Sequence, residues 1–330
     1  MTATAATDPL FEATGSVEVN RARLAYREQG AGEPVVFVHG GLSDLRTWEK
    51  QLPVIGQSYR AISYSRRYAR PNSDIDPGSD DQMLPHVDDL AAFLRAVDAA
   101  PAHLVGNSWG GFICLLTARR HPELVRSLVV EEPPVIPLVI GAGARPQPAA
   151  ITRGLLRHRA ATLATLRWGG RSVVPLQKAF RRGDDEQALE TFVHGALGKE
   201  AYERLPEARK QQMRDNLSAL KAQMLGAGFP PLTDDDVRRI RTPTLLLTGE
   251  HSPTFLLRLT DVLERLLPLA RQVEIPAASH VMHEENPAAV NRAILDFLDW
   301  QRRDASGVSR PIAIASTASG LTAGRPTDES

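Results

Sequence analysis

Residues 103–112 read H-L-V-G-N-S-W-G-G-F, and this stretch decides the fold. It runs from a short apolar strand pattern through a glycine-rich turn into a helix pattern over 109–121. The turn contains the motif G-x-S-x-G, in which a serine at a sharp strand-to-helix turn has its hydroxyl pushed clear of the backbone. The glycines of the turn carry no side chain that would clash with the neighbouring strand and helix. Ser108 is therefore the candidate nucleophile.

The composition limits the possible classes of protein. A chain of 330 residues, 42% hydrophobic and 24% charged, is long enough for one large globular domain plus an insertion. Lys+Arg and Asp+Glu balance at 39 each, so we expect neither nucleic acid nor an anionic membrane as a partner. The single cysteine, Cys114, excludes an intramolecular disulfide, and no apolar run has the length of a membrane span. The N-terminus shows no secretory signal pattern, so we expect a cytoplasmic protein. We expect this protein to be a monomer or a homodimer.

Strand patterns alternate with helix patterns on both sides of the serine. Unbroken apolar runs at 35–38 and 125–131 are typical of strands buried on both faces of a parallel sheet. The other expected elements are strands within 11–29 and at 60–65, helices over 45–55 and 82–99, a strand at 244–248, a helix ending at 267, a strand at 272–275 and a closing helix over 287–303. This alternation predicts an α/β fold with a doubly wound, mostly parallel sheet.

The middle of the chain has a different pattern and predicts a helical insertion. Over 134–236, linkers rich in proline and glycine lead into successive helical patterns with no convincing strand. We therefore expect a flexible N-terminus at 1–10, an α/β core formed by 11–133 and 237–303, and a helical cap at 134–236. Residues 304–330 are rich in Ser, Thr, Ala, Gly and Pro, and this composition predicts a disordered tail.

Taken together, these features resemble an α/β-hydrolase fold enzyme with a helical cap inserted after the strand that follows the nucleophile helix. The tripeptide His39-Gly40-Gly41 follows a buried strand and matches the oxyanion turn of that family. By this match, the backbone N–H groups of Gly41 and Trp109 would point at the negative charge of a tetrahedral intermediate. The resemblance gives His39 the task of buttressing the loop, without a catalytic role.

A base must activate the serine, because a serine hydroxyl at its own pKa is a poor nucleophile. Residues 275–287 follow a strand pattern, precede a helix and resemble the family's histidine loop. By that match, His280 is the base. His283 is the competing candidate, and its place nearer the helix start favours a surface or loop-packing role.

The acid departs from the common family pattern. Most relatives carry an aspartate shortly after the strand at 244–248, where this chain has Ser252, which has no carboxylate. A minority, including certain haloalkane dehalogenases and zearalenone lactonases, take the acid from the end of the strand after the nucleophile helix. Resemblance to that minority places the acid on Glu132. Adjacent residues at a strand end point to opposite sides, so Glu131 stays an alternative, as does Glu250 in the later turn.

Ser108, His280 and Glu132 imply a cofactor-independent serine hydrolase that cleaves an ester or lactone of a small, largely apolar substrate through an acyl-enzyme. No metal-ligand spacing such as H-E-x-x-H is visible, so neither a metal nor a cofactor is expected. A serine nucleophile argues against the dehalogenase and epoxide hydrolase branches of the fold, which use a carboxylate. Other functions stay open on the same scaffold: a carbon-carbon bond hydrolase, a lyase, a cofactor-free peroxidase or a slow-turnover ligand-binding receptor.

Side chains facing the catalytic edge are expected to set substrate size. The candidates are Leu42, beside the oxyanion turn, and three aromatic residues of the insertion, Trp168, Phe180 and Phe192, because aromatic rings fill the most volume. Residues 64–70 contain arginines where many relatives have an Asp-x-x-Gly-x-Gly-like loop. We expect these arginines to face water.

Overall fold

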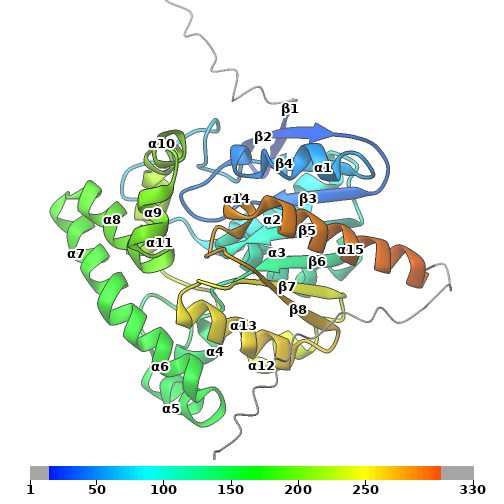
Figure 1. The fold of residues 1–330 in the computed structure, drawn as a ribbon. Coiled ribbons are helices and arrows are strands. Elements are labelled where there is room, and N and C mark those ends of the chain that lie inside the picture. The colour runs from blue at the N-terminus through cyan, green and yellow to red at the C-terminus, as the bar shows by residue number, and fades with distance from the viewer. Residues whose placement is uncertain (1–14, 306–330) are drawn as a thin grey trace, which may run out of the picture.

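The computed structural model describes residues 15–305, whose strands form one eight-stranded sheet with the order β1-β2-β4-β3-β5-β6-β7-β8 (Figure 1). Strand β2 pairs antiparallel with β1 and β4, and the remaining neighbours pair in parallel. The doubly wound, mostly parallel sheet predicted from the sequence is thus confirmed. The segment 1–10 and nearly all of the tail at 304–330 lie outside the described residues. Within 15–305, no helix has the length and apolar character needed to cross a bilayer.

The strands are β1 (Gly15–Val19), β2 (Ala22–Gln29), β3 (Pro34–Val38), β4 (Arg60–Tyr64), β5 (Ala102–Asn107), β6 (Val125–Glu131), β7 (Thr244–Gly249) and β8 (Ala270–Ile275). The helices beside them are η2 (Leu45–Trp48), α1 (Leu52–Ile55), α2 (Met83–Ala96), α3 (Ser108–Arg120), η3 (Pro122–Leu124), α13 (Thr254–Leu266), α14 (Met282–Glu285) and α15 (Pro287–Ala305).

The continuous helix expected over 45–55 is wrong. The 3-10 helix η2 ends at Trp48, and a separate short helix, α1, begins at Leu52. Pro53, in the first turn of α1, has no N–H to donate to a carbonyl one turn earlier, so a helix continuing from η2 would be interrupted there. At its other end, η2 is capped by the side chain of Asp44, which accepts a hydrogen bond from the backbone N–H of Arg46.

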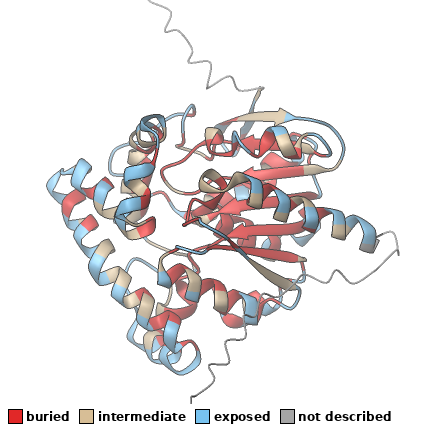
Figure 2. Ribbon diagram, viewed as in Figure 1, coloured by how far each residue is buried: buried red, intermediate tan, exposed pale blue. Residues whose placement is uncertain are grey.

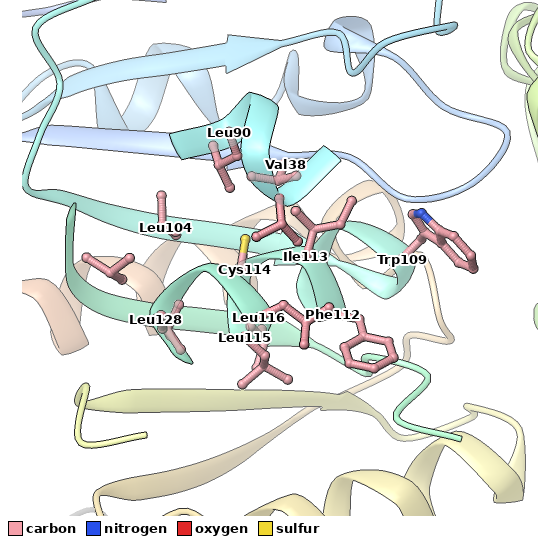
Figure 3. Packing of buried hydrophobic residues seen from close by; sticks show 14 of the residues in the cluster. Val38, Leu90, Leu104, Trp109, Phe112, Ile113, Cys114, Leu115, Leu116 and Leu128 are labelled. Atoms are coloured by element: carbon pink, nitrogen blue, oxygen red, sulfur yellow. The ribbon is translucent and has the colours of Figure 1, made fainter. Parts of the chain in front are cut away.

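Successive residues of the central strands pack against helices on opposite faces of the sheet. Val38, Leu104 and Leu128 belong to the apolar cluster under α2, α3 and α13, and Figure 3 shows them beside Leu90 of α2 and the side chains of α3. The intervening strand residues, such as Val105, belong to a second cluster under α1 and α15. The central strands are consequently buried on both faces (Figure 2), as the unbroken apolar runs predicted.

Helices fill the chain between β6 and β7. They are α4 (Pro137–Ile140), α5 (Pro148–Arg157), α6 (Arg159–Trp168), the π-helix η4 (Gly169–Val173), α7 (Val174–Arg182), α8 (Asp185–Ala196), α9 (Lys199–Arg204), α10 (Glu207–Asp215), α11 (Leu217–Leu225) and α12 (Asp234–Arg238). Figure 1 shows most of them, in green, gathered at one side of the sheet. An isolated bridge, in which the N–H of Gly143 donates to the carbonyl of Phe229 at 2.8 Å, joins the two ends of this block.

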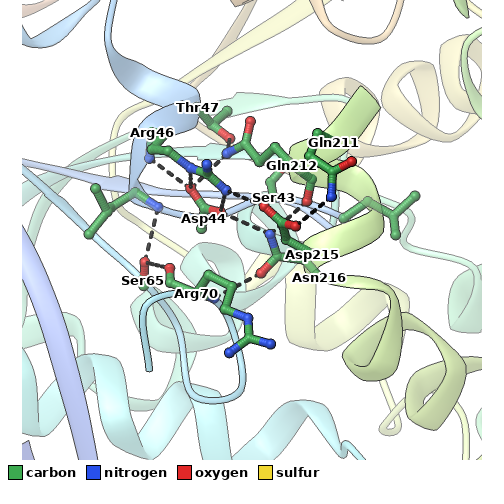
Figure 4. A network of polar contacts seen from close by, with 12 residues as sticks. Ser43, Asp44, Arg46, Thr47, Ser65, Arg70, Gln211, Gln212, Asp215 and Asn216 are labelled. Carbon is green, nitrogen blue, oxygen red and sulfur yellow. Dashed lines mark hydrogen bonds and ion pairs between the residues drawn. The ribbon is translucent and has the colours of Figure 1, made fainter. Parts of the chain in front are cut away.

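A buried carboxylate fixes the insertion to the loop after β3. Asp44 accepts hydrogen bonds from Gln212 Nε2 at 2.7 Å and Asn216 Nδ2 at 2.8 Å. It also forms an ion pair with Arg46 at 2.8 Å, and Figure 4 shows all of these contacts meeting on one side chain. Each of the two carboxylate oxygens is thus satisfied, which a buried charge requires.

Candidate active site

Ser108 lies at the first residue of α3, directly after β5, with a backbone φ of 50°. This left-handed conformation is strained for a residue with a side chain, and such strain is concentrated at functional positions. The surrounding packing requires glycine: a Cβ on Gly110 would lie 2.2 Å from the carbonyl oxygen of Val38. A Cβ on Gly106 would lie 2.8 Å from the backbone of Gly110. The strand, turn and helix expected around the serine are therefore present.

Ser108 lines a cavity of about 50 Å³ together with His280, Gly41 and Trp109. The rest of the wall is largely apolar and comes mainly from the insertion and α13; it includes Ile136, Trp168, Phe192, Leu220, Met224, Phe229 and Phe255. Pockets that hold small ligands usually exceed about 300 Å³. The cavity is therefore too small for a substrate, and side chains of the cap must move to admit one.

The imidazole of His280 contacts the carboxylate of Glu132. Nδ1 lies 2.7 Å from Oε2, and both side chains are buried. An ionised carboxylate only accepts hydrogen bonds, so Nδ1 is the donor and Nε2 is left with a free lone pair. The other oxygen of Glu132 accepts the backbone N–H of Gly249 at 2.9 Å, which holds the carboxylate in place.

Glu131, the alternative acid, has a histidine of its own. His283 Nδ1 lies 2.7 Å from Glu131 Oε2, and both side chains are buried. Of the two roles expected for His283, at the surface or packed in the loop, the structure shows the second, because the side chain is buried. Glu250 instead accepts the backbone N–H of Ala277 at 2.7 Å, in an exposed turn. Of the three glutamates, Glu132 is the one with a contact to His280 in the described structure.

A chain of charges runs from Glu131 to the oxyanion loop. Burial alone would lower the pKa of His283, but Glu131 and Glu284 outweigh it and raise that pKa to about 9. Burial would raise the pKa of Glu284, but Arg209, 2.7 Å away, and His283 lower it to about 2. Arg209, on helix α10, also donates to the carbonyl of Leu42 at 2.9 Å. The insertion, the oxyanion loop and the histidine loop are thus held together by one network.

Asn107, the residue before Ser108, was not identified from the sequence as a site residue. Its Nδ2 donates to Glu131 Oε2 and to the carbonyl oxygen of His280, both at 3.1 Å. It therefore joins the end of β5 to the end of β6 and to the histidine loop. The available signal was its position between the strand and the serine, since a polar side chain there is at the catalytic edge of the sheet.

Arg66 corrects the expectation that the arginines of 64–70 face water. Its side chain is buried and donates to the carbonyls of His39 at 3.1 Å and Gly40 at 2.9 Å. His39 Nε2 accepts the backbone N–H of Arg66, so its Nδ1 donates to the carbonyl of Gly40. Burial and the charge of Arg66 hold the pKa of His39 well below its usual value, which keeps this imidazole neutral.

These contacts orient the peptide between Gly40 and Gly41. The carbonyl of that peptide points toward Arg66 and His39, which both donate to it at 2.9 Å. In a planar trans peptide the N–H points the opposite way. The N–H of Gly41 therefore points away from Arg66, and Gly41 itself lines the cavity of Ser108.

Two of the four expected lining residues line this cavity. Trp168 and Phe192 are in its wall. Leu42 and Phe180 are not among the residues that line it, because both are buried in the apolar cluster between α7, α8 and the neighbouring helices. Position beside the His39-Gly40-Gly41 turn and the volume of aromatic rings selected these candidates without showing which of them face the cavity.

A larger groove adjoins the catalytic cavity on the side of the cap. It has a volume of about 370 Å³ and is lined by parts of α6, α7, η4 and the two linkers of the insertion. Trp109, Trp168, Met224 and Phe229 line both spaces. The ring centroids of Trp109 and Phe229 lie 5.2 Å apart. Ile136 and Gln223 also line both spaces, so the cavity and the groove share a mostly apolar boundary.

The family model for the alpha/beta hydrolase fold matches residues 33–287 of this chain. The chain belongs to the α/β-hydrolase fold family. It is similar over most of its length to a solved structure of the family, a thermophilic esterase from Thermogutta terrifontis. That match has a TM-score of 0.66 and 22% identity, and covers 87% of this chain and 98% of the esterase.

Two relatives of this α/β hydrolase carry names that refer to different reactions. The 2-(acetamidomethylene)succinate hydrolase of Mesorhizobium japonicum is 25% identical over 285 residues, which cover 86% of this chain and 94% of that protein. The protein named non-heme bromoperoxidase BpoC, of Mycobacterium tuberculosis, is 37% identical over 109 residues. The match to BpoC covers 32% of this chain and only 40% of the length of BpoC.

Proposed function

We propose that this α/β hydrolase cleaves ester or lactone bonds through an acyl-enzyme, with Ser108 as nucleophile, His280 as base and Glu132 as acid. The observation that carries the proposal is the 2.7 Å contact between His280 Nδ1 and Glu132 Oε2, in a cavity that Ser108 also lines. This contact leaves Nε2 of His280 as the acceptor for the serine proton, which is the arrangement that activates a hydroxyl nucleophile.

In the proposed reaction, Ser108 attacks the carbonyl carbon while His280 takes the hydroxyl proton. The N–H groups of Gly41 and Trp109 stabilise the resulting oxyanion. His280, now an imidazolium stabilised by Glu132, returns the proton to the departing alcohol oxygen. Water then attacks the acyl-enzyme by the same route, which releases the acid and restores the serine. No cofactor or metal takes part in any of these steps.

The lining supports a substrate with a substantial apolar part. Rings and aliphatic side chains dominate the wall of the catalytic cavity. The groove of about 370 Å³ beyond Trp168 and Phe229 offers room for an alkyl or aryl group once these side chains move. We assign the apolar part of the substrate to this groove.

Removal of the nucleophile tests the proposal. Ser108→Ala should leave a folded protein whose kcat on nitrophenyl esters and simple lactones is lower by roughly 10⁶, because the lost hydroxyl makes the covalent bond. A fluorophosphonate probe should label the wild type at residue 108 and leave the variant unlabelled. Retention of more than a few per cent of the rate by Ser108→Ala would contradict the assignment.

The same assay separates the other functions that the scaffold allows. Turnover of a dienoic ketone in preference to esters would indicate a carbon-carbon bond hydrolase, and oxidation of halide by peroxide would indicate a peroxidase. Labelling of Ser108 without turnover of any substrate would indicate a ligand-binding receptor. Fast, Ser108-dependent hydrolysis of esters or lactones is the outcome that we expect.

A further inference from the structure

Gln223 of helix α11 brings a polar group into the otherwise apolar wall of the site. Its side chain is 5% exposed and lines both the catalytic cavity and the adjoining groove. Its amide nitrogen donates a hydrogen bond, but its carbonyl oxygen Oε1 has no partner within the part of the chain that the structure describes. A buried acceptor without a donor is unfavourable, and such groups in native proteins call for an explanation.

The orientation of this amide is fixed from behind. Gln223 Nε2 donates to Oδ2 of the buried Asp81 at 2.7 Å, and Asp81 Oδ1 lies 2.6 Å from Nε2 of His86. Burial would raise the pKa of Asp81, but His86 and Arg66 outweigh it and lower that pKa, so Asp81 is ionised. A carboxylate only accepts hydrogen bonds. The amide therefore cannot flip, and Oε1 must face away from Asp81.

Oε1 lies beside the oxyanion turn. An ideal Cβ built on Gly41 would be 3.9 Å from Gln223 Oε1 and 3.8 Å from Cδ1 of Leu220. Gly41, Leu220 and Ser108 all line the same cavity. The acceptor is thus close to where the scissile carbonyl of a substrate would bind.

A donor without a partner lines the same space. Trp109 Nε1 is buried and has no hydrogen-bond partner in residues 15–305. Figure 3 shows its indole pointing away from the core cluster under α3, and the residue lines both the cavity and the groove. The wall therefore presents one unused acceptor and one unused donor, with apolar side chains around them.

We propose that Gln223 Oε1 accepts a hydrogen bond from a hydroxyl or N–H group that the substrate carries within a few bonds of its scissile carbonyl. The preferred substrate is then an apolar ester or lactone bearing such a donor, and the plain alkyl analogue is disfavoured because it leaves Oε1 unpaired. This inference rests on the proposed ester or lactone hydrolysis and adds the substrate class to it.

The test compares esters that differ by one hydroxyl. The reference is hexyl butyrate, and the three hydroxylated esters are hexyl 2-hydroxybutyrate, hexyl 3-hydroxybutyrate and 2-hydroxyhexyl butyrate, so that the donor is placed on either side of the ester. In the wild type, kcat/KM should favour at least one hydroxylated ester by roughly tenfold or more, since a site built to bind a hydroxyl rejects the analogue without it. In Gln223→Met this ratio should fall to within about twofold of one.

Two further variants separate a specific role of Gln223 from a general effect on the cap. Gln211→Met removes an exposed glutamine from helix α10 and should keep the wild-type ratio. Asp81→Asn replaces the acceptor-only carboxylate behind the amide with a side chain that can also donate. Gln223 can then take either orientation, and the ratio should fall between the values of the wild type and Gln223→Met. A ratio unchanged in Gln223→Met, or no hydroxyl preference in the wild type, overturns the inference and leaves ester hydrolysis standing.

If the wild type hydrolyses none of these esters, that result counts against the proposed function itself. The inference about Gln223 is then tested by measuring ester binding. Trp109 and Trp168 line the cavity, so the tryptophan fluorescence of Ser108→Ala should report ester binding directly. A Kd for a hydroxylated ester roughly tenfold below that for hexyl butyrate is expected, and the difference should vanish in the double variant with Gln223→Met. Equal Kd values for all four esters in Ser108→Ala would overturn the inference.

Discussion

Two consecutive glutamates at the end of β6 take different partners. Glu132 contacts His280, and Glu131 contacts His283, each at 2.7 Å. Glu131 is the last residue of β6, whereas Glu132 follows the strand with a left-handed backbone φ of 44°. This change of backbone direction lets the two adjacent side chains reach different histidines. Which glutamate contacts His280 therefore depends on its exact position in the chain, and not only on its residue type.

Glu132→Gln tests the proposed acid while keeping the shape of the side chain. Without the negative charge, the imidazolium is not stabilised and its tautomer is no longer fixed, so kcat on a nitrophenyl ester should fall by roughly 10² to 10⁴. Glu250→Gln is the matched control. The side chain of Glu250 accepts a hydrogen bond from the backbone N–H of Ala277, whereas His280 contacts Glu132. It should keep a kcat close to wild type. The opposite result, with Glu250→Gln inactive and Glu132→Gln active, would move the acid to Glu250.

Candidate site residues could be predicted from the sequence where they belong to a motif. Residues whose burial depends on contacts between distant parts of the chain were missed. Ser108 and His280 follow recognisable patterns, and Glu132 followed from resemblance to one branch of the family. Arg66 was expected to face water because most arginines do. Its burial depends on carbonyls at His39 and Gly40, which are distant in sequence and come together only when β3 and β4 pair.

The helices of the insertion show the same limit of prediction from sequence, now for whole secondary-structure elements. Helical spacing predicted helices over most of 134–236, and nine α-helices begin and end between Pro137 and Arg238. Helical spacing identifies the apolar face of a helix. When a helix lies between a packed core and a cavity, the same apolar face contacts both, so spacing does not show which residues line the cavity. Phe180 of α7 packs in the cluster, whereas Phe192 of α8 lines the cavity.

This pair of phenylalanines makes a matched experiment. Phe192→Ala should widen the cavity and shift the ester preference toward longer or bulkier acyl groups, with little change in Tm, because this side chain is only partly buried. Phe180→Ala removes a ring from a packed cluster and should cost about 3 to 5 kcal/mol of unfolding free energy with unchanged chain-length preference. The measurements are kcat/KM across a series of nitrophenyl esters and thermal unfolding. Loss of stability with unchanged preference in both variants would mean that Phe192 is also structural.

At the scale of the whole molecule, the pH dependence of stability should reflect the buried charges around His283. The pKa of His283 is raised from 6.5 to about 9, so its contribution is complete below about pH 6.5 and is lost as pH rises through 9. The pKa of Glu284 is lowered from 4.5 to about 2, so its contribution is complete above about pH 4.5 and is lost as pH falls toward 2. The contribution of these two groups to the unfolding free energy is therefore greatest between about pH 4.5 and 6.5. The buried His39 and His103 have lowered pKa values, so their contribution is complete above about pH 6.5 and is lost as pH falls below it.

Urea unfolding across this pH range measures the effect. In Glu284→Gln, the decline of stability on the acid side should be shallower than in the wild type, since the titrating carboxylate is absent. The decline on the alkaline side should persist, because His283 keeps its contact with Glu131. Acid limbs that superimpose in the wild type and Glu284→Gln would show that Glu284 does not contribute to the pH dependence.

The bridge between Gly143 and Phe229 has a consequence for the history of the protein. The chain leaves the sheet after β6 and returns at β7, its neighbour, and the bridge ties the outgoing and returning segments together. Residues 144–228 lie between these two segments of the chain, and no strand pairing of the sheet runs through them. Replacement of residues 144–228 would keep Ser108, His280 and Glu132 in the chain and would remove the contacts of the insertion with the loop after β3. Exchange of the helical insertion is therefore a route by which proteins with the same sheet come to bind different substrates while they keep the same catalytic residues.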